Sequence, residues 1–217
     1  MSLTVLALFG LPFHQSASAE IAAEEQMRLN ACIRLVETDP RAAYEDSLAW
    51  LGNGNRPRAR YCNAKALLGL GYTEEGAARL EALANAPDAI ALDRRAEYMA
   101  EAGNAWFSAS YPDAAIKAFS EAIEIDPRNG DYYKDRAAAF LALEKWFEAI
   151  DDLEIALQLQ PNNPEALFFR SRAYFGLEDF TQAQRDIQAA RVGDPENVDY
   201  ALQRGHIREQ IRLRQER

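Results

Sequence analysis

Histidine and cysteine are scarce in this chain of 217 residues, which has two of each. Catalysis and metal binding need several reactive groups held in mutual geometry, and the two histidines, His14 and His206, stand far apart in the sequence. A glycine-rich phosphate-binding loop, a Ser-His-Asp arrangement and clustered metal ligands are also lacking. We therefore expect a protein that is not an enzyme, with no catalytic residues, no bound metal and no cofactor.

A positive net charge is absent as well, because the formal net charge is −10. The phosphate backbone attracts Lys and Arg, so we do not expect nucleic acid as a partner. The charge is unevenly placed: residues 96–203 hold 20 acidic and 9 basic residues, whereas residues 204–217 hold 2 acidic and 5 basic ones. The basic end is either a solvated terminal helix or a contact with an acidic surface, its own or a partner's.

The apolar run at residues 3–13 is too short to cross a bilayer as a helix, which takes about 20 apolar residues. The small residues Ala17 and Ala19 precede Glu20, as at a signal-peptide cleavage site. We expect a signal peptide at residues 1–19, cleaved after Ala19, and an exported or periplasmic protein without an integral membrane span. Because no Lys or Arg precedes the run, the alternative is a cytoplasmic protein whose N-terminal apolar helix packs on the rest.

The sequence does contain a repeat with a period of 34 residues. Proline, two alanine positions and a large apolar position recur with that period, and a small residue and an aromatic residue precede them. Proline ends helices, and small residues recur where two helices approach closely. The repeating positions are Pro127, Pro161 and Pro195; Ala122, Ala156 and Ala190; Phe119, Leu153 and Ile187; Ala115, Ala149 and Ala183; Trp106, Phe140 and Tyr174; and Gly103, Ala137 and Ser171.

This pattern resembles the tetratricopeptide repeat, a unit of 34 residues that folds as two antiparallel helices. The resemblance implies an all-α fold, a right-handed solenoid of stacked helix pairs. Residues 96–129, 130–163 and 164–197 carry the pattern in full, with helices near 97–108 and 113–125 in the first unit. Arg136 and Arg170 depart from it, since they replace the leucine that is usual in the first helix.

The two ends of the array are less regular. Residues 20–95 read as irregular helical pairs, and residues 198–217 as a C-terminal capping helix near 198–213. Cys32 and Cys62 fall in predicted helices at 21–37 and 58–70. If these are the first helices of neighbouring pairs they lie side by side, which permits a disulfide in an exported chain. The alternative is two buried free cysteines that pack as small apolar residues.

The resemblance also implies a function, because the inner wall of such an array, formed by the first helix of each unit, usually binds peptide segments. We expect a scaffold or adaptor of the bacterial envelope that binds a peptide of a protein partner of unknown identity. The alternative is a structural module that self-associates as a homo-oligomer without a peptide ligand. The expected wall residues are Asn104, Phe107, Asp131, Lys134, Leu141, Phe168, Arg172 and Phe175.

Some tetratricopeptide domains hold the C-terminal carboxylate of a chaperone with a clamp of Lys, Asn and Arg side chains. At the matching positions this chain has Ala100, Asn104, Asp135, Glu165 and Phe169, so only the asparagine is kept. We therefore expect no such clamp. Apolar wall residues would instead bury a partner's side chains, while Asn104, Lys134 and Arg172 would bind its backbone or its carboxylates. Phe168 and Phe169 are adjacent, so at least one of them is expected in the core.

Overall fold

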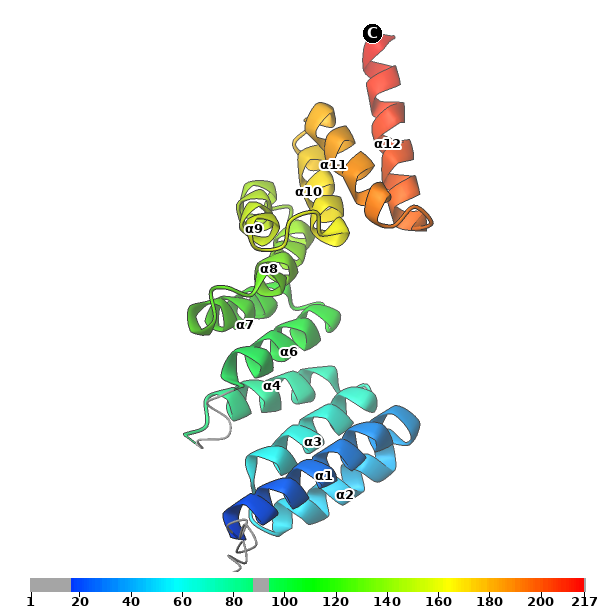
Figure 1. Ribbon diagram of the computed structural model, residues 1–217. Helices are drawn as coiled ribbons and strands as arrows, with labels where there is room; N and C mark the ends of the chain where they lie inside the picture. The colour runs from blue at the N-terminus through cyan, green and yellow to red at the C-terminus, as the bar shows by residue number, and fades with distance from the viewer. Residues whose placement is uncertain (1–16, 88–93, 217) are drawn as a thin grey trace, which may run out of the picture.

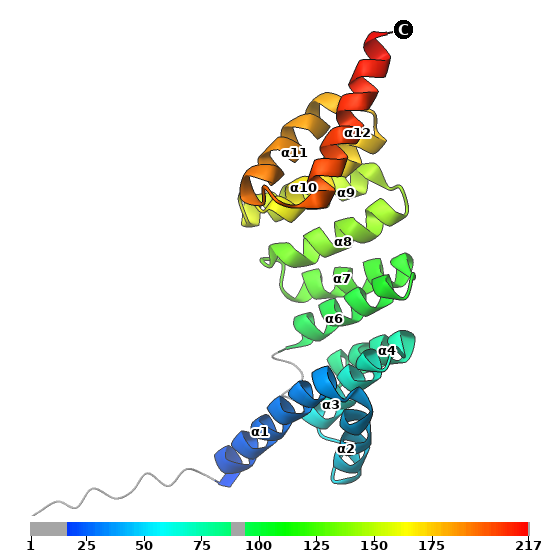
Figure 2. The same ribbon diagram turned by 90° about the vertical axis from the view of Figure 1, so that its right-hand side faces the viewer.

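The computed structural model describes residues 17–87 and 94–216, and every regular element in them is an α-helix (Figure 1). Successive helices run antiparallel and stack into an elongated column, as the view in Figure 2 also shows. The helices are α1 (Ala17–Thr38), α2 (Pro40–Gly52), α3 (Pro57–Gly69), α4 (Thr73–Ala84), α6 (Arg95–Ser108), α7 (Pro112–Ile125), α8 (Gly130–Ala142), α9 (Trp146–Leu159), α10 (Pro164–Gly176), α11 (Phe180–Gly193) and α12 (Val198–Gln215).

The predicted solenoid of stacked helix pairs is confirmed. The pairs are α1–α2, α3–α4, α6–α7, α8–α9 and α10–α11, and α12 packs on α11 at the end of the stack. The helices predicted at 97–108, 113–125, 58–70 and 198–213 are α6, α7, α3 and α12, and their bounds differ by at most two residues. Residues 1–16 lie outside the described part of the chain, so the expected signal peptide and its cleavage remain predictions.

The second helix of each regular pair ends one residue short of an X-Pro bond, as predicted: a single non-helical residue separates it from the proline. Asp126, Gln160 and Asp194 are the residues that follow α7, α9 and α11, and each has left the helical region, with ψ of 87°, 78° and 86°. The cause is the steric clash between the proline ring and a preceding helical residue. The next helix begins three residues after each proline, so the proline recurs with the period of the stack.

An asparagine side chain caps the N-terminus of α8, α10 and α12. The Asn163 side-chain oxygen accepts hydrogen bonds from the amides of Glu165 and Ala166, both at 3.1 Å. Asn129 and Asn197 occupy the same place 34 residues before and after, and cap α8 and α12. Such caps satisfy backbone donors that the first helical turn leaves unpaired.

Within each pair, a small residue on the first helix receives a large side chain from the second. Ala137 and Leu153 are both fully buried, and so are Phe119 and Ile187 at the equivalent large position. A Cβ atom added to Gly103 would lie 2.7 Å from the Phe119 ring, so that contact requires glycine. The small and large positions read from the sequence therefore do form the core.

The two arginines that depart from the repeat pattern form ion pairs inside their helix pairs. Arg136 of α8 donates two hydrogen bonds to Asp152 of α9, both at 2.7 Å. Arg170 of α10 binds Asp186 of α11 in the same way, at 2.6 and 2.9 Å. Both aspartates are nearly fully buried, and the bidentate geometry satisfies both of their oxygens.

Cys32 of α1 and Cys62 of α3 form a disulfide, and their Cα atoms are 6.0 Å apart. The two helices are first helices of neighbouring pairs and contact each other directly. Within residues 17–87 and 94–216, no helix is both long and apolar enough to span a membrane. The front of the column is thus linked covalently, whereas the regular pairs are held by packing and ion pairs.

Candidate partner-binding groove

The first helices of successive pairs line one side of the column. Direct contacts join α1 to α3, α6 to α8, α8 to α10 and α10 to α12. Among the described residues, contacts of that extent do not join the second helices of successive regular pairs, α7 to α9 or α9 to α11. Elements on the inner side of a curved stack lie closer together, so α3, α6, α8 and α10 form the concave wall.

A cavity of about 410 Å³ opens on this wall between α3 and α6. Lys65 Nζ lies 2.9 Å from Glu101 Oε2 in it, and the Tyr61 hydroxyl donates to the other Glu101 oxygen at 2.7 Å. Burial and the nearby Glu101 carboxylate raise the pKa of Tyr61, so the phenol stays a hydrogen-bond donor. The lining residues are Lys65, Leu68, Thr73, Glu101, Asn104, Ala105 and Ser108.

The predicted wall residues of α6 lie at this cavity or next to it. Asn104 is exposed and lines the cavity, and Phe107 is exposed over 36% of its surface. An exposed amide beside an exposed aromatic ring suits a peptide, because the amide can pair with its backbone and the ring can cover an apolar side chain.

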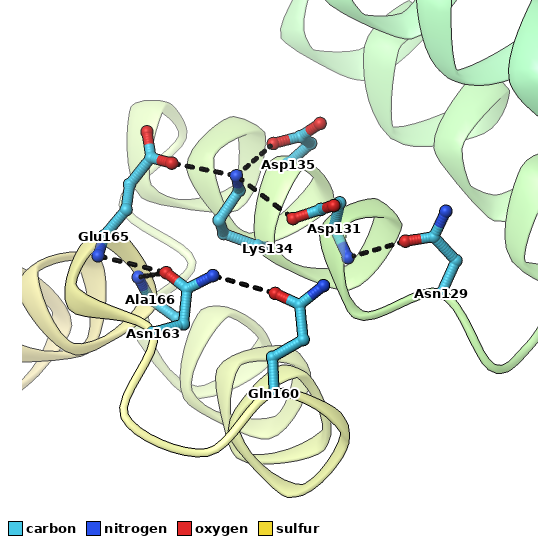
Figure 3. Close-up of polar contacts among 8 residues, drawn as sticks. All are labelled: Asn129, Asp131, Lys134, Asp135, Gln160, Asn163, Glu165 and Ala166. Atoms are coloured by element: carbon cyan, nitrogen blue, oxygen red, sulfur yellow. Dashed lines mark hydrogen bonds and ion pairs between the residues drawn. The ribbon is translucent and has the colours of Figure 1, made fainter.

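Further along the wall, the Lys134 ammonium is surrounded by carboxylates (Figure 3). Its Nζ lies 2.8 Å from Glu165, 3.4 Å from Asp131 and 3.6 Å from Asp135. Burial alone would lower the pKa of Lys134, but the Glu165 hydrogen bond and the three negative charges raise it instead. Three carboxylates around one ammonium leave this part of the wall with a net negative charge.

Asp135 is the most enclosed of these carboxylates. Burial raises its pKa, and the Lys134 charge and a hydrogen bond from Asn104 partly oppose that rise. Asn104 therefore joins the α6 wall to the α8 carboxylates. The polar residues of α6, α8 and α10 form one continuous strip.

The structure corrects two expectations for this wall. Leu141 is only 4% exposed and packs with Tyr133 and Ala149 in the core of its own helix pair, so it does not face the groove. Lys134 was expected to bind a partner's carboxylate. Its ammonium already contacts three carboxylates of this chain, so it does not offer a free positive charge there.

The predicted residues of α10 lie at the last part of the wall. The Phe168 ring is half-buried against Tyr200 of α12, with centroids 4.9 Å apart, and Phe175 packs on Phe180 of α11 at 5.5 Å. Arg172 is exposed, and its guanidinium lies 5.8 Å from the Phe168 ring centroid. Of the predicted α10 residues, Arg172 is thus the one most open to a partner.

Sequence reasoning did not select Lys65, Glu101 or Asp135 as binding residues. The signal that could have found them is position: all three lie on first helices, at places that turn toward the same side. The Arg136–Asp152 pair was not predicted either. Its signal is a spacing of 16 residues, which recurs in Arg170–Asp186.

No protein-family model matches the chain. The STIP1 homolog of Dictyostelium discoideum is 46% identical over 50 residues, which are 23% of this chain and 9% of that protein. The chain therefore spans only a small part of this relative. The human serine/threonine-protein phosphatase 5 matches similarly, 38% identical over 66 residues, which are 13% of its length.

Solved structures match a longer part of the chain. The TPR domain of Arabidopsis OM64 is 31% identical with a TM-score of 0.52, and the match covers 52% of this chain and 94% of that domain. This chain has the tetratricopeptide-repeat fold. MamA from Desulfovibrio magneticus, 20% identical with a TM-score of 0.64, extends the likeness in fold to 72% of this chain and 86% of that one.

One tetratricopeptide structure of this kind contains a peptide. The first TPR domain of Spaghetti (RPAP3), bound to the HSP90 peptide SRMEEVD, is 26% identical with a TM-score of 0.52. The match covers 54% of this chain and 92% of that domain. This neighbouring structure is thus a protein-interaction domain, which agrees with a role of this chain in protein interaction.

Proposed function

We propose that this protein binds a peptide segment of a protein partner in the concave groove formed by α3, α6, α8 and α10. The observation that carries the proposal is the cavity between α3 and α6, which continues into the polar strip at Lys134. The peptide held by the similar Spaghetti domain supports the same mode of binding. A preformed rigid groove limits the entropy that is lost when a peptide binds.

The charge of the groove favours a basic peptide over an acidic one. Asp131, Asp135 and Glu165 outnumber the one ammonium among them, and Glu101 balances Lys65 in the cavity. Complementary charges steer association and exclude partners of the wrong sign. The acidic peptide of the Spaghetti complex is therefore not the type of ligand that we propose here.

We further propose that the partner is a protein of the bacterial envelope. The signal-like pattern at residues 1–19 supports export, and so does the Cys32–Cys62 disulfide, because disulfides persist in oxidising compartments. Fractionation of cells that express the chain with residues 1–19 included tests this part. Recovery of the uncleaved chain in the cytoplasm with both cysteines reduced would contradict it.

Binding of fluorescent peptide pools tests the groove. One pool carries Lys and Arg at random positions and the other carries Asp and Glu, with the same apolar residues in both. We expect the basic pool to bind, and Asn104→Trp to abolish that binding because the ring fills the cavity. Arg128→Glu, at an exposed site outside the groove, is the matched control and should bind as the wild type does.

Equal binding of both pools, or full binding by Asn104→Trp, would contradict the proposed groove. Light scattering on the same samples addresses the self-associating alternative. A dimer that buries Asn104 and excludes the peptides would favour that alternative instead.

A further inference from the structure

The last helix repeats the residues that join the two helices of a regular pair. Arg136 and Ala137 of α8 recur 34 residues later as Arg170 and Ser171 of α10, and again as Arg204 and Gly205 of α12. In α8 and α10 the arginine binds an aspartate of the second helix. The small residue that follows it faces a fully buried large side chain, Leu153 or Ile187.

In α12 neither of these positions has its partner within the described part of the chain: Arg204 is half-buried and Gly205 is exposed. Among the described residues, 17–87 and 94–216, no hydrogen bond or ion pair reaches the Arg204 guanidinium. Gly205 is exposed, and a Cβ atom added there would meet no atom within 4 Å, whereas at Gly103 it would lie 2.7 Å from the Phe119 ring. Ala201 and Arg208, one turn away on either side, are exposed too. This side of α12 is the one on which α8 and α10 receive their second helix.

We propose that this open face of α12, formed by Ala201, Arg204, Gly205 and Arg208, is a docking site for an acidic amphipathic helix of a partner protein. The regular pairs supply the geometry: a carboxylate of the incoming helix binds Arg204, and the large apolar side chain next to it lies over Gly205. In α9 and α11 these two residues are adjacent, as Asp152–Leu153 and Asp186–Ile187.

The charge of the helix argues for an acidic partner. Residues 204–217 hold 5 basic and 2 acidic residues, and Arg204 and Arg208 both lie on the open face. A cationic face attracts an anionic helix and repels an identical face of a second copy. The site is distinct from the concave groove, so its test does not depend on the groove.

The test uses a fluorescein-labelled peptide with the sequence of residues 146–159, which is α9, and the complete 217-residue chain. This peptide is acidic and carries Asp152 followed by Leu153. We expect saturable binding by fluorescence anisotropy. Arg204→Asp in the protein, or Asp152→Lys in the peptide, should each weaken binding about tenfold or more. The two changes together should restore most of it, because the ion pair is reformed with its charges exchanged.

Two control variants distinguish binding at this site from non-specific charge attraction between the peptide and the protein. Gly205→Leu keeps the charge but fills the space over which the apolar side chain lies, and it should also weaken binding. Arg128→Asp makes the same charge change at an exposed site outside α12 and should leave binding unchanged. Circular dichroism checks that each variant keeps its helices.

The proposal is overturned if no saturable binding occurs up to about 1 mM peptide, or if Arg204→Asp binds like the wild type. It is also overturned if the exchanged pair fails to recover affinity. Sedimentation velocity on the wild-type protein without peptide tests whether a second copy of the chain occupies the site. A dimer that Arg204→Asp dissociates would make another copy of this chain the occupant, in place of a partner helix.

Discussion

The front helix pair α3–α4 and the regular pair α8–α9 have different side chains at the equivalent positions where their two helices meet. In the front, Asn63 donates to Ser47 Oγ at 2.9 Å and accepts from Arg79 at 2.7 Å. In the regular pair, Arg136 donates to Ser120 Oγ at 2.9 Å and to both oxygens of Asp152. The spacing of 16 residues between successive members is the same in both.

The helix pair between these two in the chain, α6–α7, has a third arrangement at the same positions. In α6–α7 the two positions are Ala102 and Ala118, both buried. An amide with an arginine, an ion pair or two methyl groups can therefore occupy these two positions. In the two polar arrangements the buried polar atoms named above have partners, without which burial of a polar group is costly. The front differs in one more respect, because it alone carries a disulfide among the described residues.

The largest expected effect comes from removing one partner of the Arg136–Asp152 ion pair. Asp152→Ala leaves the Arg136 charge without its partner, and we expect the free energy of unfolding to fall by about 3 to 5 kcal/mol. Arg136→Leu combined with Asp152→Ala gives the pair an apolar contact like that of α6–α7, and should recover to within about 1 kcal/mol of the wild type. Urea denaturation followed by circular dichroism measures both.

Asp151→Ala is the matched control, since Asp151 is the exposed neighbour of Asp152. It should change the free energy of unfolding by no more than about 0.5 kcal/mol. If the double variant were as unstable as Asp152→Ala, the ion pair of α8–α9 and the apolar contact of α6–α7 would not be interchangeable.

Removal of the disulfide should have the next largest effect, and it should be confined to the front. Cys32→Ala with Cys62→Ala opens a link across 30 residues, and we expect a loss of about 3 to 4 kcal/mol in the stability of the front pairs. Hydrogen exchange should accelerate in α1 and α3 but not in α10, since a stacked repeat passes its stability only to neighbours. Faster exchange throughout the chain would show that front and regular pairs unfold together.

Two glycines at equivalent positions should respond in opposite ways. Gly103→Ala places a Cβ atom 2.7 Å from the buried Phe119 ring and should cost about 1 to 3 kcal/mol. Gly205→Ala meets no atom within 4 Å and should stabilise α12 by up to about 1 kcal/mol, because alanine favours the helix. Thermal melts of the two variants compare a closed contact with an open one. Equal shifts would mean that α12 is not open at Gly205.

The smallest effect concerns the asparagine caps of α8, α10 and α12. Asn163→Ala removes the acceptor for the Glu165 and Ala166 amides, and should lower stability by about 1 kcal/mol. Asn163→Asp keeps an acceptor and should melt close to the wild type. A loss of the same size in both variants would point to packing of the side chain rather than to capping.

The 34-residue period predicted the helices because its cause is local. Proline interrupts a helix except in its first turn, and a small residue is needed wherever two helices approach, so α6 to α11 follow from the sequence alone. The concave wall was predicted less well. Leu141 was misplaced because the same turn of α8 serves both the groove and the core, and the rotation that decides between them is set by packing.

The charge of the groove could not be read from the sequence for a related reason. Lys134 looked like a free cation. Asp131 lies three residues before it on the same helix, but Glu165 comes from α10, and its approach depends on the distance between α8 and α10. Arg136 and Arg170 looked like departures from the pattern. Their aspartate partners 16 residues later show that each departure comes with its compensation on the facing helix.

Site-specific photocrosslinking in cells tests the central claim, that the concave side binds the partner, most directly. A photoreactive amino acid replaces Ser108, which lines the groove cavity, or Glu124, which is exposed on the second helix α7. The account predicts a discrete crosslinked product from position 108 and none from position 124. A product from position 124 alone would contradict it, because the partner would then bind the opposite side of the column.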